Sequence, residues 1–350
     1  MSKKMANSTT DVVIVGSGIS GLVLSKLLKE QQIDHVVLQR VEQRKALELP
    51  ETLPPSTLVL LESLNLLELF SKSSSKTFGY HSLWKSEVLQ TDTFFNHNPY
   101  KYGLKLNKTQ LLQDLQSIVS DHMVSFHNLT ELERTNKSVT ITVETESEEH
   151  TIHGKILVDA TGRNRAMVKQ LGILSESFDD QIALSCHLPY FKHPKLVHPI
   201  FVESFEHGWG IVSPLNNATN AMTLYTQKGS PLLPDLKAYS NWENLLANTK
   251  ILKDFLSDNP DQKVFGGNAN SSRAAQITGP NWLAIGDAAI AFDPLSSHGV
   301  SNAIYCASAA AKAIDSEDRL GGIVSYGDTL SQVFEMYLKQ REVKYEGVNS

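Results

Sequence analysis

The sequence predicts a two-domain α/β protein, in which one domain has a parallel sheet flanked by helices and a smaller domain has a mixed or antiparallel sheet. Three observations favour this fold class. A β-branched run near the N-terminus leads into a glycine turn and a helix, short strands alternate with turns over residues 182–225, and a strand over 281–285 leads into an alanine-rich helix over 300–314. The chain of 350 residues is long enough for two domains of roughly 100–200 residues each.

The first element predicts a dinucleotide site. A strand over 11–15 ends in the glycine turn Gly16-Ser17-Gly18-Ile19-Ser20-Gly21, which a helix over 22–30 and a strand over 35–38 follow. In such a unit the first glycine permits the tight turn, Gly18 lets the backbone approach a pyrophosphate, and Gly21 lets helix and strand pack closely. The phosphates then lie at the helix N-terminus. Gln39, followed by Arg40, replaces the acidic residue expected to hold a ribose hydroxyl.

The middle of the chain alternates between the two domains. Residues 56–70 carry leucines at helical spacing, which predicts one packed helix, whereas residues 79–103 gather aromatic and polar side chains without helical periodicity. A second helix is expected over 109–119. A hairpin of strands 139–145 and 151–158 follows, and its second strand runs into Asp159-Ala160-Thr161-Gly162.

Composition and charge exclude several classes of function. The 32 basic and 38 acidic residues leave a formal net charge of −6, so we expect no nucleic acid partner. No window holds the roughly 18–20 apolar residues of a membrane span, and residues 1–10 lack a secretory signal, which predicts a cytoplasmic protein. Cys186 and Cys306 form no CxxC pair and the histidines lack metal-ligand spacing, so we expect no metal site.

The chain resembles a known family through three motifs in order: the turn from Gly16 to Gly21, the run Asp159-Ala160-Thr161-Gly162, and Gly286-Asp287 with Asp293-Pro294-Leu295-Ser296-Ser297-His298-Gly299. Together they resemble the FAD-binding signature of glutathione-reductase-type flavoproteins. More narrowly, the third motif resembles the branch that contains aromatic hydroxylases, geranylgeranyl reductases and flavin-dependent tryptophan halogenases. The resemblance implies a Rossmann-like FAD-binding domain with a β-meander, and a substrate domain.

The resemblance also implies site residues and domain boundaries. Asp287 would bind a ribityl hydroxyl, and Pro294 and Gly299 would lay backbone N–H groups beside the flavin at a helix N-terminus, whose partial positive charge suits the reduced ring. FAD is expected to be non-covalent. The FAD-binding domain is expected over 1–78, 104–180 and 269–350, and the substrate domain over 79–103 and 181–268. The expected cofactor-binding residues are Gly16, Ser17, Gly18, Ile19, Ser20, Gly21, Gln39, Arg40, Lys108, Ala160, Thr161, Gly162, Gly286, Asp287, Pro294, Gly299 and Val300.

Differences between this sequence and those families narrow the range of reactions that we expect it to catalyse. His207 stands at the first tryptophan position of the halogenase two-tryptophan motif, and Gly79 stands where halogenases carry a lysine, so the lysine that activates halide is absent there. The Asp-Gly motif that accompanies tight NADPH use in one-component hydroxylases is also missing. Only about fifty residues follow the third motif, whereas larger relatives continue into a helical domain; this predicts a cleft open to a protein substrate.

As a whole, the chain looks most like the flavoproteins that mature tryptophylquinone enzymes by oxidising a tryptophan in a precursor protein. That resemblance implies a precursor of a quinone-cofactor oxidase as partner, with a flavin reductase or another electron donor. His298 and Glu51 are candidates for proton transfer, and Trp84, His207, Trp209 and Tyr225 for an aromatic substrate pocket, although core packing explains any single aromatic residue. Two alternatives stay open: a small-molecule aromatic hydroxylase or other flavin oxidoreductase, and an FAD-containing assembly factor without redox turnover.

Overall fold

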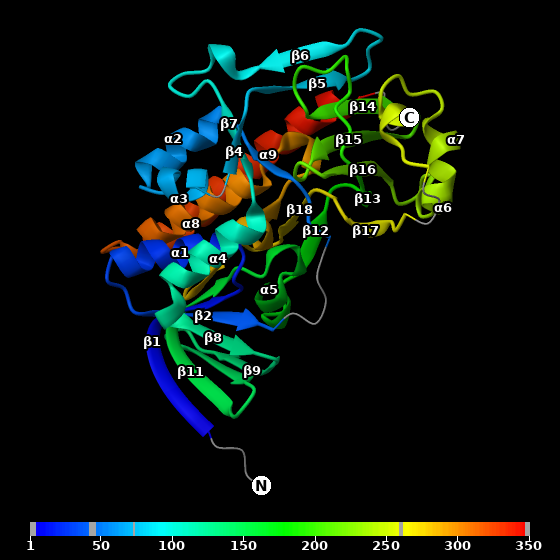
Figure 1. Ribbon diagram of the computed structural model, residues 1–350. Helices are drawn as coiled ribbons and strands as arrows, with labels where there is room; N and C mark the ends of the chain where they lie inside the picture. The colour runs from blue at the N-terminus through cyan, green and yellow to red at the C-terminus, as the bar shows by residue number, and fades with distance from the viewer. Residues whose placement is uncertain (1–4, 42–46, 73, 259–261, 347–350) are drawn as a thin grey trace. The chain divides into compact units, whose positions relative to one another are not determined.

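The computed structural model describes residues 5–41, 47–72, 74–258 and 262–346 (Figure 1). The chain divides into two compact units. The first unit comprises residues 1–45, 109–177 and 272–337, and the second comprises 46–108, 178–271 and 338–350. Among the described residues, no helix is long and apolar enough to cross a membrane.

The first unit is built on a sheet of eight strands whose central part is parallel. Figure 1 shows several of these strands side by side. The parallel strands, in order across the sheet, are β20 (Trp282–Ala284), β11 (Glu149–Asp159), β1 (Met5–Val15), β2 (His35–Arg40) and β8 (Met123–Phe126). Antiparallel pairing adds β9 (Asn128–Arg134) and β10 (Val139–Glu144) beyond β11, and β19 (Thr278–Gly279) beyond β20. The parallel core with its β-meander confirms the predicted fold class.

In the part of the chain that the structure describes, five α-helices belong wholly or partly to the first unit. They are α1 (Ile19–Glu30), α4 (Lys108–Ile118), α5 (Ala166–Gln170), α8 (Gly299–Asp315) and α9 (Arg319–Tyr345), whose last residues belong to the second unit. The α1 helix packs against α8, and Lys29 at its end donates to the carbonyl of Ile118 in α4. A small sheet of β12 (Ser175–Ser177), β18 (Ser272–Ala274) and β21 (Ile290–Ala291) completes the unit.

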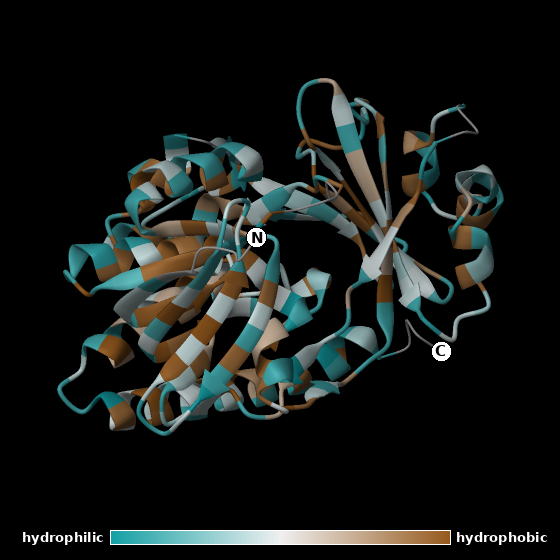
Figure 2. Cartoon of the chain, turned by 90° about the horizontal axis from the view of Figure 1, so that it is seen from below, coloured by the Kyte–Doolittle hydropathy of each residue, from teal (hydrophilic) through white to brown (hydrophobic). Residues whose placement is uncertain are grey.

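The β1 strand illustrates why these residues form a buried sheet. Val12, Val13 and Ile14 have no exposed surface, and strands covered on both faces are favoured by such β-branched runs. Figure 2 shows hydrophobic residues along the strands and hydrophilic residues at the turns. The carboxyl ends of β1, β2, β11 and β20 are in register, so the loops that follow them start at one edge of the sheet.

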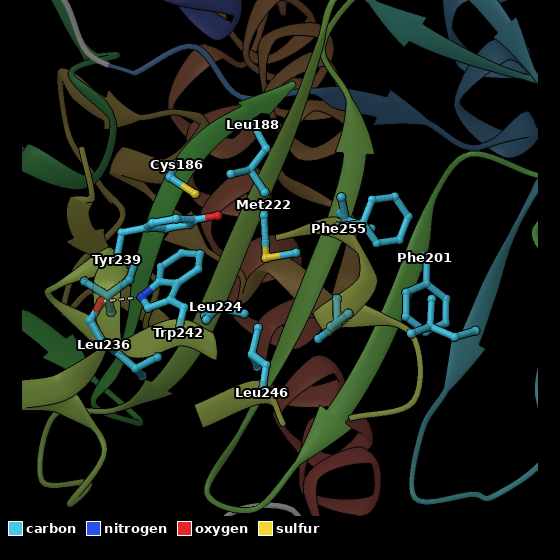
Figure 3. Packing of buried hydrophobic residues seen from close by; sticks show 14 of the residues in the cluster. Cys186, Leu188, Phe201, Met222, Leu224, Leu236, Tyr239, Trp242, Leu246 and Phe255 are labelled. Carbon is cyan, nitrogen blue, oxygen red and sulfur yellow. Dashed lines mark hydrogen bonds between the residues drawn. The ribbon is translucent and has the colours of Figure 1, made fainter. Parts of the chain in front are cut away.

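The second unit holds a mixed sheet of seven strands. Across the sheet these are β17 (Phe265–Asn268), β13 (Gln181–Pro189), β16 (Thr219–Gln227), β15 (Gly208–Pro214), β14 (Phe201–Phe205), β5 (Gly79–Leu83) and β6 (Gln90–Thr93). Of the described pairs in this sheet, β14–β5 is parallel and the others are antiparallel. The helices α6 (Leu233–Leu236) and α7 (Trp242–Leu246) pack on this sheet and bury Tyr239 and Trp242 over Cys186 and Met222 (Figure 3).

A second sheet of this unit explains where the units depart from the expected boundaries. β3 (Glu51–Leu53) and β4 (Ser74–Thr77) both pair with β7 (Gly103–Leu106), so residues 46–78 cluster with 103–108 rather than with the first unit. The expected single helix over 56–70 is wrong. It is broken into α2 (Pro55–Ser63) and α3 (Leu67–Lys72), because Asn65 takes a left-handed conformation (φ +53°) that asparagine tolerates better than most residues.

Candidate functional site

The glycine turn after β1 contains glycines with two different roles. A Cβ on Gly16 would lie 2.3 Å from the carbonyl oxygen of Ala160, and one on Gly21 would lie 2.1 Å from the carbonyl oxygen of Gly16. These two glycines are therefore required by packing, and Gly16 also has φ +118°. Gly18 differs, because a Cβ there would meet no described atom within 4 Å. Its exposed backbone begins α1, which has no side-chain cap.

The second motif is organised by the carboxylate of Asp159, which is fully buried at the end of β11. One oxygen accepts from the backbone N–H (2.9 Å) and hydroxyl (2.6 Å) of Thr161. The other accepts from the N–H groups of Met167 and Val168, at 3.0 and 2.9 Å. Asp159 thus fixes the turn from Ala160 to Gly162 to the start of α5.

The third motif begins at Gly286 (φ +58°), after β20, and its turn is anchored by Asp293. The Asp293 carboxylate accepts from Ser296 N–H at 3.2 Å, and its own N–H donates to the hydroxyl of Tyr337 at 2.9 Å. Pro294 starts the short helix in this turn, and α8 then begins at Gly299 without a side-chain cap. A Cβ on Gly299 would also meet no described atom within 4 Å.

The three motifs meet pairwise within the first unit. Gly16 contacts Ala160, as described, and joins the first motif to the second. Gly286 lies against Ser20, whose Oγ would be 3.0 Å from a Cβ on the glycine, and so joins the first to the third. The N–H of Ile285 donates to the carbonyl of Asp159 at 2.9 Å, which joins the second to the third.

Two arginines outside the predicted site residues lie where the second and third motifs meet. Arg163 Nε is 3.4 Å from the carboxylate of Asp287, and its other end donates to the carbonyl of Phe292 at 2.6 Å. Arg165 is buried and donates to the carbonyls of Ala288 (3.1 Å) and Ser272 (3.0 Å). Burial lowers the pKa of Arg165 to about 10, so it stays charged at neutral pH. The sequence signal for these two residues is that both arginines closely follow Gly162 of the second motif.

This arrangement fits a flavin dinucleotide. The uncapped helices α1 and α8 present backbone N–H groups beside glycines that leave open space, which is the requirement for a pyrophosphate and for an electron-rich ring. Asp287 offers a carboxylate for a ribityl hydroxyl. Gln39 and Arg40 end β2, directly beside the glycine turn, since Gly16 N–H donates to the carbonyl of Leu38.

Two further predicted residues lie in the second unit and contact each other. Lys108, at the start of α4, is 3.1 Å from Glu51 Oε1 in a half-exposed ion pair. One was expected to bind the cofactor and the other to transfer protons. Their pairing shows that each has a structural partner, and their roles stay predictions.

The predicted aromatic pocket forms a connected cluster in the second unit. Trp209 stacks on Tyr225 across β15 and β16, with ring centroids 4.0 Å apart, and Trp84 meets the edge of Trp209 at 5.9 Å. Tyr345 of α9 adds a fourth ring, 5.8 Å from Trp84, and Trp84 Nε1 donates to the carbonyl of Lys344 at 3.0 Å. Trp209 and Tyr225 are buried, whereas Trp84 is half-buried.

The two histidines take separate positions. His207 sits in the turn between β14 and β15 with φ +61°, and no ring contact links it to the aromatic cluster among the described residues. His298 precedes α8, and its ring meets the edge of Phe292. Desolvation by neighbouring atoms lowers the pKa of His298 below its ordinary value, while Asp293 opposes that shift. The imidazole is therefore mostly neutral at pH 7.

Gly79 has no space for a side chain. A Cβ there would lie 2.1 Å from the carbonyl oxygen of Asp92 in β6 and 2.8 Å from Nε2 of His198. A lysine could occupy this position only if the β5–β6 pairing opened. Among the described residues, no group of three or more His, Cys, Asp or Glu side chains is arranged to hold a metal.

The fold and the three convergent motifs define a flavin-binding protein. A family model described as "FAD binding domain" matches residues 9–317, so the chain belongs to that family and its cofactor is FAD.

Two curated relatives share part of the chain. LodB from Marinomonas mediterranea, named as an FAD-dependent oxidoreductase, is 25% identical over 202 residues, which is 56% of this chain and 53% of LodB. A 1H-pyrrole-2-carbonyl-[peptidyl-carrier protein] brominase from Pseudoalteromonas luteoviolacea is 28% identical over 200 residues, 51% of this chain and 47% of the brominase. The chain thus spans about half the length of the curated relatives it matches.

Among solved structures, the fold is similar to that of QhpG, named a peptidyl tryptophan dihydroxylase essential for tryptophylquinone cofactor biogenesis. The TM-score is 0.73 at 16% identity, and the match covers 98% of this chain and 76% of QhpG. These findings confirm the resemblance to flavin-dependent monooxygenases and halogenases.

Proposed function

We propose that this chain is an FAD-dependent monooxygenase that oxidises a tryptophan side chain of a precursor protein during tryptophylquinone biogenesis. The observation that carries the proposal is the convergence of the three motifs on one flavin site within the first unit. Two relatives support a substrate carried on a protein, because QhpG is named for a peptidyl tryptophan and the brominase for a pyrrole on a carrier protein.

The chain's own residues would hold FAD non-covalently and orient it. The N–H groups at the start of α1, beside Gly18, would bind the pyrophosphate, and Asp287 would accept a hydrogen bond from the ribityl chain. The N-terminus of α8, beside Pro294 and Gly299, would favour negative charge on the flavin pyrimidine. The bound flavin supplies the reduction and activation of dioxygen.

The aromatic cluster supports an indole substrate. Trp84 is the half-buried member of the row that continues to Trp209 and Tyr225, so it can offer an aromatic edge to another ring. A docked precursor would also exclude water from the reacting atoms, which a small molecule does less completely. We therefore expect coupled oxygenation only with the protein substrate.

The experiment is to incubate the FAD-loaded protein with a candidate oxidase precursor, dioxygen and a reductant, and to weigh the precursor while hydrogen peroxide is measured. We expect the precursor to gain oxygen on a tryptophan, with little peroxide. Free tryptophan should give mainly peroxide. Efficient turnover of free tryptophan would instead favour a small-molecule aromatic hydroxylase. A protein that binds the precursor while its flavin is never reduced and reoxidised would favour an assembly factor without redox turnover.

We expect NADPH alone to reduce the flavin slowly, so that a flavin reductase or another donor supplies electrons. The physical reason is that Asp159, in the region where an Asp-Gly motif would assist NADPH, is fully buried and occupied by four hydrogen bonds. Stopped-flow absorbance measures this directly. Fast, saturable reduction by micromolar NADPH or NADH would contradict it. The cytoplasmic location of the protein stays a prediction.

We expect no halogenation, although one relative is a brominase. The reason is that the backbone and side chains around Gly79 leave no room for a lysine side chain. Tryptophan and a tryptophan peptide would be incubated with reduced FAD, dioxygen and bromide or chloride, and then analysed by mass spectrometry. A halogenated product that requires the enzyme would refute this expectation.

A further inference from the structure

One face of the three-stranded sheet of β3, β7 and β4 carries its buried leucines, together with the polar residues Glu51, Ser74 and Lys76. Residues directly opposite each other in antiparallel strands share a face. Leu53 and Leu104 are therefore on one face together with Leu106, and all three are buried. The opposite face carries polar groups: Lys105 lies between Thr52 of β3 and Ser75 of β4, and Thr77 lies opposite Gly103.

Lys105 is a cation that has no counter-ion among the described residues. It is half-buried on the central strand, and it makes no hydrogen bond or ion pair with any residue that the structure describes. Neighbouring lysines are matched: Lys108 pairs with Glu51, and Lys76 lies over the ring of Tyr102 at 4.1 Å. Burial lowers the pKa of Lys105 to about 8, and no neighbouring charge is needed to explain the shift.

Thr77 supplies a second unsatisfied group on the same face. Its side chain is 4% exposed, and within the described part of the chain its hydroxyl has no hydrogen-bond partner. A Cβ on Gly103 would lie 3.3 Å from the methyl group of Thr77 and 3.2 Å from the ring of Phe94. The hydroxyl therefore shares its surroundings with an aromatic ring. A buried hydroxyl without a partner is costly, which makes it a marker of a missing ligand.

We propose that Lys105, with the hydroxyls of Thr52 and Thr77, forms a binding site for an anionic oxygen group, a carboxylate or a phosphate. The ammonium supplies the charge, the hydroxyls supply hydrogen bonds, and the ring of Phe94 packs beside an apolar or aromatic part of the ligand. Two kinds of free anion share this chemistry: an aromatic carboxylate, for which benzoate is the probe, and inorganic phosphate. The inference does not depend on the proposed reaction.

The test follows the titration of Lys105 in the FAD-loaded protein. Reductive methylation with ¹³C-formaldehyde labels the amine and keeps its charge, so NMR gives the pKa of Lys105 with and without benzoate or inorganic phosphate. A bound anion favours the charged amine, so we expect the pKa to rise by about one unit, a tenfold preference for the ammonium form. Lys105→Met should abolish binding of the probe and Thr77→Val should weaken it.

Lys101→Met is the matched control, because Lys101 is an exposed lysine over the ring of Phe95 in the same unit, and this variant should bind the probe normally. A rise of the pKa with benzoate alone assigns the site to a carboxylate ligand, and a rise with phosphate alone assigns it to a phosphate ligand. Either outcome supports the site. A pKa that responds to neither probe would overturn the proposal, and so would unchanged probe binding by Lys105→Met.

Discussion

Gly18→Val is expected to purify without FAD while keeping its fold. A valine side chain would enter the open space beside the N-terminus of α1, where the pyrophosphate is proposed to lie. We expect affinity for FAD to fall on the order of 100-fold, about 2.8 kcal/mol. Because Gly18 is also the N-cap of α1, the FAD-free fold should lose no more than about 1 kcal/mol. Visible flavin absorption and thermal unfolding with and without added FAD measure both effects.

The matched control is Gly229→Val, in an exposed turn of the second unit. A Cβ at Gly229 also meets no described atom within 4 Å, so the same substitution adds the same bulk in open space. This variant should retain FAD at the wild-type level. Full retention of FAD by Gly18→Val would place the pyrophosphate elsewhere.

Arg341→Met should destabilise the second unit by about 3–5 kcal/mol, because it leaves a buried carboxylate without its cation. Arg341 Nη2 is 3.1 Å from Asp179, and the two side chains are 12% and 6% exposed. Asp179 also accepts from the N–H groups of Gln181 and Ser271, both at 3.0 Å, which holds it in place. Urea denaturation with matched slopes measures the change in the free energy of unfolding.

The same substitution should alter the aromatic cluster. The Arg341 guanidinium lies 4.5 Å over the ring of Tyr345, which in turn meets Trp84. We therefore expect a change in tryptophan fluorescence. Arg273→Met is the control, since Arg273 pairs with the more exposed Glu176 and such pairs contribute about 1 kcal/mol or less. Equal destabilisation by the two variants would show that burial of the Arg341–Asp179 pair does not set its contribution.

The glycine turn was predictable because the requirements on its glycines are local in the sequence. Gly16 and Gly21 are fixed by contacts within a few ångströms of their own backbone, and Gly18 by the requirement for open space. Such requirements act within one strand–turn–helix unit, so spacing alone reveals them. The fold class was predictable for the same reason, because each strand and helix carried its own periodicity.

Long-range pairing explains what the sequence did not reveal. Residues 46–78 join the second unit because β3 and β4 pair with β7, a register that no local pattern encodes. Arg341 and Tyr345 lie near the end of the chain, and their partners Asp179 and Trp84 are distant in sequence. The position of Lys105 on β7, where no described residue pairs with its amine, likewise depends on long-range strand pairing.

The second motif shows an intermediate case. Ala160, Thr161 and Gly162 were selected for the cofactor, yet the structure makes Asp159 the residue that organises them. Its role depends on the N–H groups of α5, which the sequence does not place. Arg163 could have been noticed beside Gly162, but its pairing with Asp287 needed the third motif to be brought close.

The most direct test of the central claim is to supply dioxygen labelled with the heavy isotope of oxygen to the reduced, FAD-loaded protein and its candidate precursor. Digestion and mass spectrometry then report the mass of each tryptophan-containing peptide. The account predicts heavy oxygen on one tryptophan peptide, because a monooxygenase transfers an atom of dioxygen to its substrate. Oxygen of natural mass on that peptide, which would come from water, or no gain of oxygen at all in a precursor that binds the protein, would contradict the account.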